Sequence, residues 1–114
     1  IGSPTHTDLI SKVTEICIKK QKINSLYHIA SKGEVSWFDF AKYLINGANK
    51  RGVKFKCKES HIEPISSKYS KAIARRPKNS LLDSSKIKNT CKIDIPKWQV
   101  HADLFLDDYL GERL

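Results

Sequence analysis

Two adjacent arginines mark the segment of this sequence whose residue types are best suited to bind an anion. Arg75 and Arg76 precede Pro77, and Asn79 and Ser80 follow in the same segment. A guanidinium carries a permanent charge and presents forked donors that match a phosphate, whereas a lysine offers only a point charge. The residues alone leave two interpretations open: a phosphate-binding loop or an ordinary solvated basic loop.

Catalytic and nucleotide-binding motifs are missing from the sequence. It contains no glycine-rich dinucleotide loop, no P-loop, no zinc-protease helix motif and no serine-hydrolase elbow.

Cys17, Cys57 and Cys91 are widely spaced, so we expect three free thiols in a reducing, cytoplasmic compartment. No apolar run is long enough to span a membrane. Because the catalytic and nucleotide-binding motifs are missing, the sequence predicts that this chain alone is inactive as an enzyme.

The net charge of +9 is unevenly distributed along the chain. Most of the excess positive charge lies between Lys50 and Lys78, where only Glu59 and Glu63 oppose it. Such a block can bind nucleic acid, bind a phosphorylated small molecule, or simply be solvated. We expect it to lack interleaved exposed aromatic residues, which argues against a nucleic-acid site.

A length of 114 residues fits one compact domain with four helices and two or three short strands. We predict one helix after Thr5, a second after Ser36, and a brief third helix capped by Ser84 or Ser85 that ends at Lys88. A fourth helix has Pro96 in its first turn. Apolar runs with β-forming residues predict strands at 26–30, 53–57 and 80–83. The alternation indicates an α/β fold, although three short strands cannot make a self-contained doubly wound sheet.

Local signals define the ends and buried faces of these helices. The spacing of Thr5 and Asp8 predicts a capping box, and Ser36 predicts a second N-cap. Trp37 and Trp98 lie in phase with other apolar residues, so we predict that both belong to the core. In the last helix, the predicted apolar face consists of Trp98, Ala102, Phe105 and Tyr109.

Four motifs occur in order along the chain: Gly2-Ser-Pro-Thr5, the segment 26–41, Ala74-Arg-Arg-Pro-Lys-Asn-Ser80 continuing to Asp83, and Ile95-Pro-Lys-Trp98. Together they resemble the motifs of the dTDP-4-dehydrorhamnose reductase family, which are extended short-chain dehydrogenases. The resemblance covers nearly the whole chain. It implies that residues 1–114 form one C-terminal, substrate-binding lobe of a Rossmann-type fold.

The resemblance also implies an activity for a longer parent protein. Family members reduce dTDP-4-dehydro-6-deoxy-L-mannose to dTDP-L-rhamnose with NADPH or NADH. Their cofactor loop and Tyr-x-x-x-Lys pair would lie upstream of Ile1, in an N-terminal NAD(P)-binding domain that this chain lacks. Because the sequence contains no methionine, we expect it to be a piece of such a protein.

The resemblance assigns candidate site residues for a dTDP-sugar. These substrate-binding candidates are Pro4, Thr5, Arg75, Arg76, Asn79 and Ser80. Some family members hold a divalent cation such as Mg²⁺ between the subunits of a homodimer through two carboxylates. Asp8 and Asp108 occupy the corresponding places in this sequence.

The sequence leaves two alternatives to a reductase lobe open. One is a non-catalytic relative, such as a methionine adenosyltransferase regulatory subunit, which shares the fold and an arginine–proline segment. The other is a small basic nucleic-acid-binding domain. An upstream Tyr-x-x-x-Lys pair would favour the enzyme over the first alternative.

We predict that the chain does not bind nucleic acid. A complex that neutralises several phosphates weakens steeply with salt because counterions are released on binding. Titration of duplex DNA and RNA should show no submicromolar binding at about 150 mM salt. Tight binding with a steep salt dependence would contradict this prediction.

Overall fold

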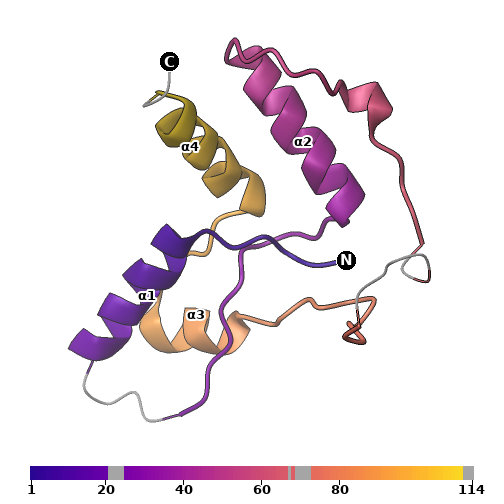
Figure 1. Ribbon diagram of the computed structural model, residues 1–114. Helices are drawn as coiled ribbons and strands as arrows, with labels where there is room; N and C mark the ends of the chain where they lie inside the picture. Colours follow the sequence, from indigo (N-terminus) through magenta and orange to yellow (C-terminus); the bar gives the residue numbers. More distant parts are fainter. Residues whose placement is uncertain (21–24, 67, 69–72, 112–114) are drawn as a thin grey trace.

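The described part of the chain contains four α-helices and the short 3₁₀ helix η1 (Figure 1). The computed structural model describes residues 1–114 except 21–24, 67, 69–72 and 112–114. The elements are α1 (Thr7–Lys19), α2 (Trp37–Lys50), η1 (Glu59–His61), α3 (Ser85–Cys91) and α4 (Trp98–Gly111). None of the helices in the described part of the chain is long and apolar enough to cross a membrane.

The N-terminus of α2 was predicted correctly, whereas that of α1 was not. The Ser36 hydroxyl oxygen accepts a hydrogen bond from the Asp39 amide at 3.0 Å, as expected of an N-cap. In α1 the cap is His6, whose Nδ1 accepts from the Asp8 amide at 3.0 Å. The Thr5 hydroxyl bonds to backbone groups outside the helix, so the predicted capping box is wrong.

The two C-terminal helices differ in detail from the sequence prediction. α3 continues beyond Lys88 to Cys91, and α4 begins at Trp98, two residues after Pro96. Phe105 and Tyr109 are 41% and 42% exposed, so they do not complete the predicted apolar face. The buried residues of α4 are Trp98, His101, Ala102 and Leu106.

The predicted strands at 26–30, 53–57 and 80–83 are absent from the described residues, which contain only two isolated β-bridges. The α/β prediction is therefore wrong for this part of the chain, whereas the four helices are confirmed. Side chains replace strand partners in the first segment. The Ser84 hydroxyl accepts from the Ala30 amide at 2.8 Å and donates to the Ala30 carbonyl at 3.2 Å. With those groups already bonded to a side chain, Ala30 does not need a strand partner.

One hydrophobic core lies between α1 and α3. It consists of Leu9, Val13, Ile87, Cys91 and Ile95. Ile87 is only 1% exposed and is the most completely buried large side chain among the described residues. Burial of these side chains, and not helix propensity, holds the seven-residue α3 in place, because so short a helix is marginal in isolation.

A second cluster, made of aromatic rings, joins α2 to α4. Trp98 is 5% exposed, and the rings of Phe40 and Tyr43 meet it edge-on at centroid distances of 5.7 and 4.9 Å. The prediction that Trp98 belongs to the core is confirmed. Trp37 is 82% exposed, so the same prediction was wrong for it. Trp37 is the first residue of α2, where a side chain leans back past the helix end and away from the partner helix.

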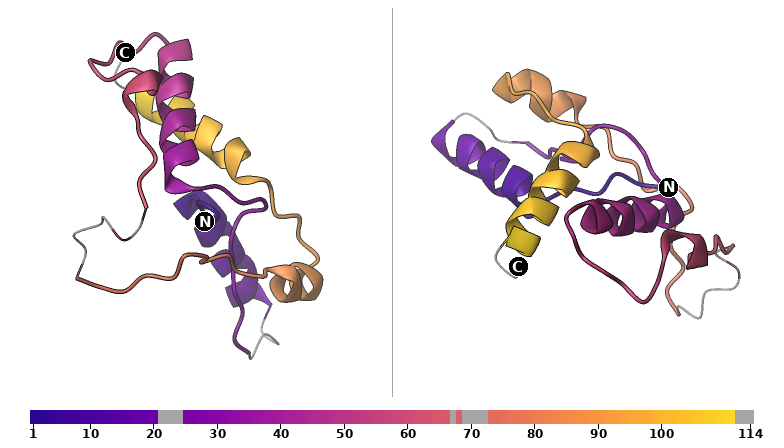
Figure 2. Two further views of the ribbon diagram at one scale, coloured as in Figure 1. Left: turned by 90° about the vertical axis from the view of Figure 1, so that its right-hand side faces the viewer. Right: turned by 90° about the horizontal axis from the view of Figure 1, so that it is seen from above.

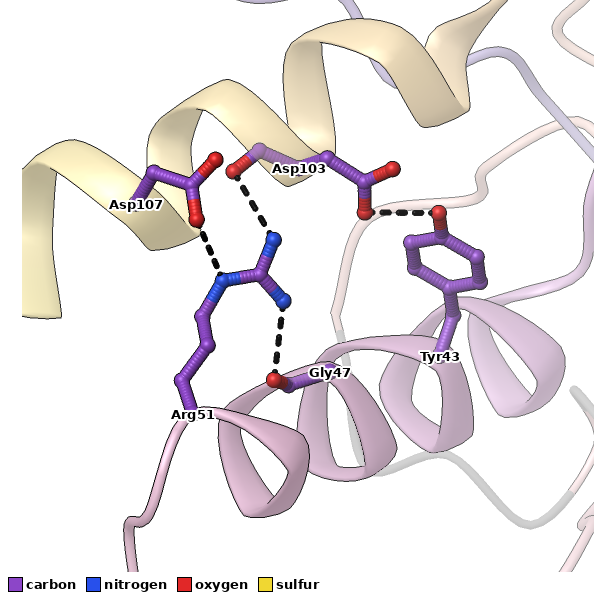
Figure 3. A network of polar contacts seen from close by, with 5 residues as sticks. All are labelled: Tyr43, Gly47, Arg51, Asp103 and Asp107. Atoms are coloured by element: carbon purple, nitrogen blue, oxygen red, sulfur yellow. Dashed lines mark hydrogen bonds and ion pairs between the residues drawn. The ribbon is translucent and has the colours of Figure 1, made fainter.

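A polar network reinforces the contact between α2 and α4 (Figure 3). The Tyr43 hydroxyl donates to an Asp103 carboxylate oxygen at 2.7 Å, and Arg51 Nε donates to Asp107 at 2.6 Å. The Arg51 guanidinium also reaches the Gly47 carbonyl at 2.9 Å. Burial, followed by the bond to Asp103, raises the pKa of Tyr43. The phenol therefore stays protonated and remains a donor at neutral pH.

The two cores are joined by a short extended segment, and the molecule as a whole is open (Figure 2). Lys32 pairs with Lys97, and Val35 pairs with Gly2. The radius of gyration is 16.8 Å, against about 13 Å for a compact domain of 100 residues. Apolar side chains such as Trp37 consequently remain in contact with solvent.

We predict that Tyr43→Phe destabilises the fold by about 1 kcal/mol, because it removes one hydrogen bond and keeps the ring against Trp98. Tyr27→Phe is the matched control, since the Tyr27 ring contacts Lys86 through its face and Phe preserves that contact. Urea denaturation measures both variants. Equal stability of the two would show that the Tyr43–Asp103 bond does not contribute.

Candidate ligand-binding site

The structure brings the start of the chain next to the end of the arginine segment. The Ser80 amide donates to the Ile1 carbonyl at 2.8 Å, and the Ser80 hydroxyl donates to the same oxygen at 3.2 Å. Gly2 is so close that a Cβ at its position would lie 2.9 Å from the Ser80 Oγ. Two of the four sequence motifs, far apart along the chain, therefore lie side by side.

Hydrogen bonds to neighbouring backbone fix the Gly2-Ser-Pro-Thr5 turn. Gly2 exchanges two hydrogen bonds with Val35, at 3.0 and 2.9 Å. The Ser3 hydroxyl donates to the Ser31 carbonyl at 2.6 Å. The Thr5 hydroxyl donates to the Ser3 carbonyl at 3.0 Å and accepts from the Ser31 amide at 3.2 Å. Pro4 is half-buried within this turn. The Thr5 hydroxyl thus shapes the turn and has no proton left to donate to a ligand.

The arginine segment is exposed to solvent. Arg75 and Arg76 have no hydrogen-bond or ion-pair partner among the described residues. Asn79 Oδ1 accepts from the Leu81 amide at 2.9 Å, which bends the chain directly after the arginines. The Asn79 amide nitrogen is not used in that bond. The segment therefore offers two guanidinium groups and an amide as donors for an anion.

A groove of about 470 Å³ continues from Ser80 along the chain. Residues 30–34 form one wall and residues 81–85 the other, with Ile95 and Lys88 completing it. Asp83 accepts from the Ser85 hydroxyl at 2.6 Å and from the Ser85 amide at 2.9 Å. These bonds lower the pKa of Asp83, so its carboxylate is ionised at neutral pH. The lining mixes apolar side chains with both signs of charge.

A larger groove of about 920 Å³ lies beside α2 and η1. Its lining includes Lys42, Lys54, Phe55 and Lys58, and Lys42 forms an ion pair with Glu59 at 3.5 Å. None of the residues predicted to bind substrate lines either groove, although the smaller groove is lined by Leu81 to Asp83, which directly follow them in the same motif. Of the two grooves, only the smaller one is continuous with the sequence motifs.

The two carboxylates predicted to share a cation lie on different helices. Asp8 is in the first turn of α1 and Asp108 is near the end of α4, and both are exposed. Within the described ranges, no group of three or more His, Cys, Asp or Glu side chains is arranged to hold a metal ion. A site between two subunits at Asp8 and Asp108 stays a prediction.

Several residues that hold this site together were not singled out from the sequence. Ser3 and Ser84 use their hydroxyls to bond backbone between segments, and the Ser31 backbone is bonded by the Ser3 and Thr5 hydroxyls. The signal for Gly2 lay within its motif, because only a residue without a side chain fits against Ser80. The serines gave no comparable signal, because their partners are distant backbone groups.

The match to known proteins identifies the class of this domain. The family profile described as RmlD substrate binding domain matches residues 1–110, so the chain belongs to that family of substrate-binding domains.

Individual relatives are all reductases by name. The dTDP-4-dehydrorhamnose reductase of Escherichia coli K12 is 27% identical over 111 residues, which cover 94% of this chain and 36% of the relative. That of Sinorhizobium fredii NGR234 is 30% identical over 106 residues, which cover 87% of this chain and 34% of the relative. The chain thus spans about a third of the length of these curated relatives. The resemblance found from the motifs is confirmed.

A buried histidine adjoins the turn. His101 is 7% exposed, its Nδ1 has no hydrogen-bond partner, and its ring stacks on His6 at a centroid distance of 5.8 Å. Burial lowers the pKa of His101, and the positive charges of His6 and Lys12 lower it further, whereas Asp8 opposes them. The folded state therefore favours the neutral ring.

We predict that stability falls as the pH drops below about 6.5, the ordinary pKa of histidine. In that range the unfolded chain binds a proton at His101 that the folded chain resists, so protonation favours unfolding. The loss should reach at most about 1.4 kcal/mol per pH unit, and it ends once the folded state also binds the proton. Denaturation in urea between pH 7.5 and 5 measures it.

His101→Gln should flatten this pH dependence, whereas the exposed His28 provides the control substitution His28→Gln. An unchanged slope in His101→Gln would assign the effect to another group.

Proposed function

We propose that this chain is the substrate-binding part of an NAD(P)H-dependent dTDP-4-dehydrorhamnose reductase and that it binds a dTDP-sugar. The observation that carries the proposal is the contact of Ser80 with Ile1 and Gly2, which places the turn motif beside the end of the arginine segment. Membership of the RmlD substrate binding domain family supports the same ligand class.

The chemistry of the exposed groups suits a nucleoside diphosphate sugar. A diphosphate carries concentrated negative charge, and forked guanidinium donors bind such oxygens in pairs. Arg75 and Arg76 have no competing partner among the described residues. The adjoining groove, with its apolar and polar lining, is suited to the sugar or the base.

In the proposed reaction, the C4 ketone of dTDP-4-dehydro-6-deoxy-L-mannose would be reduced by a nicotinamide cofactor held by another part of the parent protein. The residues of this chain do not fit that cofactor, because the sequence contains no glycine-rich phosphate loop. Their role is to bind and orient the sugar nucleotide. Holding a substrate in a productive geometry contributes to rate as well as to affinity.

We predict that Arg76→Ala lowers kcat/KM for the ketosugar roughly 10- to 150-fold in the reductase that contains this chain. The reason is the loss of one charge-assisted contact, which is worth about 1.5–3 kcal/mol. Arg76→Lys should restore only part of the loss, because a point charge does not reproduce the fork. Steady-state kinetics and thermal melting are measured together.

Lys56→Ala is the matched control, since it removes an exposed cation that lines neither groove. Its kinetics should equal those of the parent protein. If Arg76→Ala leaves the kinetics unchanged, or if its activity falls only in step with its melting temperature, Arg76 does not bind substrate. If the parent protein does not reduce the ketosugar at all, the proposed function itself is wrong.

A further inference from the structure

Two of the three cysteines share the hydrophobic core between α1 and α3. Cys91 is 5% exposed and belongs to the buried cluster, and Cys17 is half-buried and packs against the same cluster. Cys57 is exposed and lies outside it. All three side chains are free thiols in the structure. The pair Cys17 and Cys91 therefore differs from Cys57 both in burial and in its neighbours.

The Cys17 and Cys91 thiols interact within this cluster. Burial raises the pKa of Cys17, and the charge and hydrogen bonding of the Cys91 thiol raise it further, whereas the Lys20 ammonium lowers it. Lys20 Nζ also donates to the Cys91 carbonyl at 3.3 Å, which ties the end of α1 to the end of α3. Figure 1 shows these two helices lying close together in the lower part of the molecule.

The backbone around both residues can adjust to a covalent bond. Cys17 lies in the last turn of α1, and Cys91 is the last residue of α3. Lys92 follows in the left-handed conformation, with φ of 52°, and ends that helix. Disulfides require Cα atoms about 4.4–6.8 Å apart. Helix ends reach such a separation with smaller cost than helix interiors, because their backbone hydrogen bonds are incomplete.

We propose that Cys17 and Cys91 form a reversible intramolecular disulfide by exchange with a small disulfide such as oxidised glutathione. This inference does not depend on the proposed function, because it involves neither the arginine segment nor the turn. The proposed modification site lies in the core between α1 and α3. Ser84, which directly precedes α3, is hydrogen-bonded to Ala30, and both residues line the smaller groove.

The exchange proceeds in two balanced steps. The Cys17 thiolate, the more accessible of the two, attacks one sulfur of the small disulfide and releases one small thiolate. The Cys91 thiolate then attacks the Cys17 sulfur of this mixed disulfide and releases the second small thiolate. The two cysteine protons end on the two small thiols that are released. The cysteines lose two electrons in total, and the small disulfide gains them.

The pH dependence of the first step follows from the position of Cys17. Only the thiolate attacks, and the pKa of Cys17 lies above its ordinary value. The rate should therefore rise about tenfold per pH unit between pH 7 and 8.5. Lys20→Gln should slow the reaction, because it removes the charge that favours the thiolate.

The test is incubation of the folded chain with oxidised glutathione, followed by alkylation and peptide mass mapping. We expect a linked pair of peptides containing Cys17 and Cys91, about 2 Da lighter than their sum because two hydrogens are lost. Dithiothreitol should reverse the link. Cys57→Ser is the matched control and should form the same link, because Cys57 takes no part in it.

Single substitutions distinguish the attacking thiol, Cys17, from the resolving thiol, Cys91. Cys91→Ser should stop at a glutathione adduct on Cys17, because no second thiol resolves it. Cys17→Ser should leave Cys91 unmodified, because Cys91 is buried. Circular dichroism confirms that each variant is folded before it is used.

Three results would overturn the inference: a link that involves Cys57, a link that forms only in denaturant, or stable glutathione adducts on both Cys17 and Cys91. In each case the two thiols do not meet in the folded chain. Because the linked peptides are sought in the unsubstituted protein, the test holds even if a variant fails to fold.

Discussion

The arrangement of the chain depends on one extended segment that is hydrogen-bonded on both sides. Lys32 bonds to the backbone of Pro96 and Trp98, at 2.9 and 3.0 Å, and Val35 exchanges two bonds with Gly2. Residues 32–35 thereby connect the start of the chain to the start of α4. Because Ser80 is bonded in turn to Ile1, this segment also determines where the arginine segment ends.

The cores on either side of this segment are of different kinds. Between α1 and α3, aliphatic side chains and two thiols exclude water. Between α2 and α4, aromatic rings meet edge-on around Trp98, and a polar network involving Arg51 borders them (Figure 3). Edge-on aromatic contacts and charged hydrogen bonds are directional. The α2–α4 pair is therefore fixed in orientation as well as in separation.

Serine and threonine hydroxyls hold the turn and the groove, which leaves the charged groups free for a ligand. Ser3, Thr5 and Ser84 each bond to backbone from another part of the chain. Short hydroxyl side chains bring backbone segments close together without burying a charge. The exposed arginines and the open groove are then consistent with membership of a family of substrate-binding domains.

The sequence by itself determined the helices, the Ser36 cap, the burial of Trp98 and the family, because each depends on residues close together in the chain or on the order of short motifs. It wrongly predicted strands, since apolar alternation shows that a segment can pair but not whether a partner strand exists. Only the tertiary structure decided that Trp37 is exposed, that Ser80 meets Gly2, and that Cys17 and Cys91 share one core. The last two of these join residues far apart in the chain, and the exposure of Trp37 depends on its place at the start of α2. Local periodicity encodes neither.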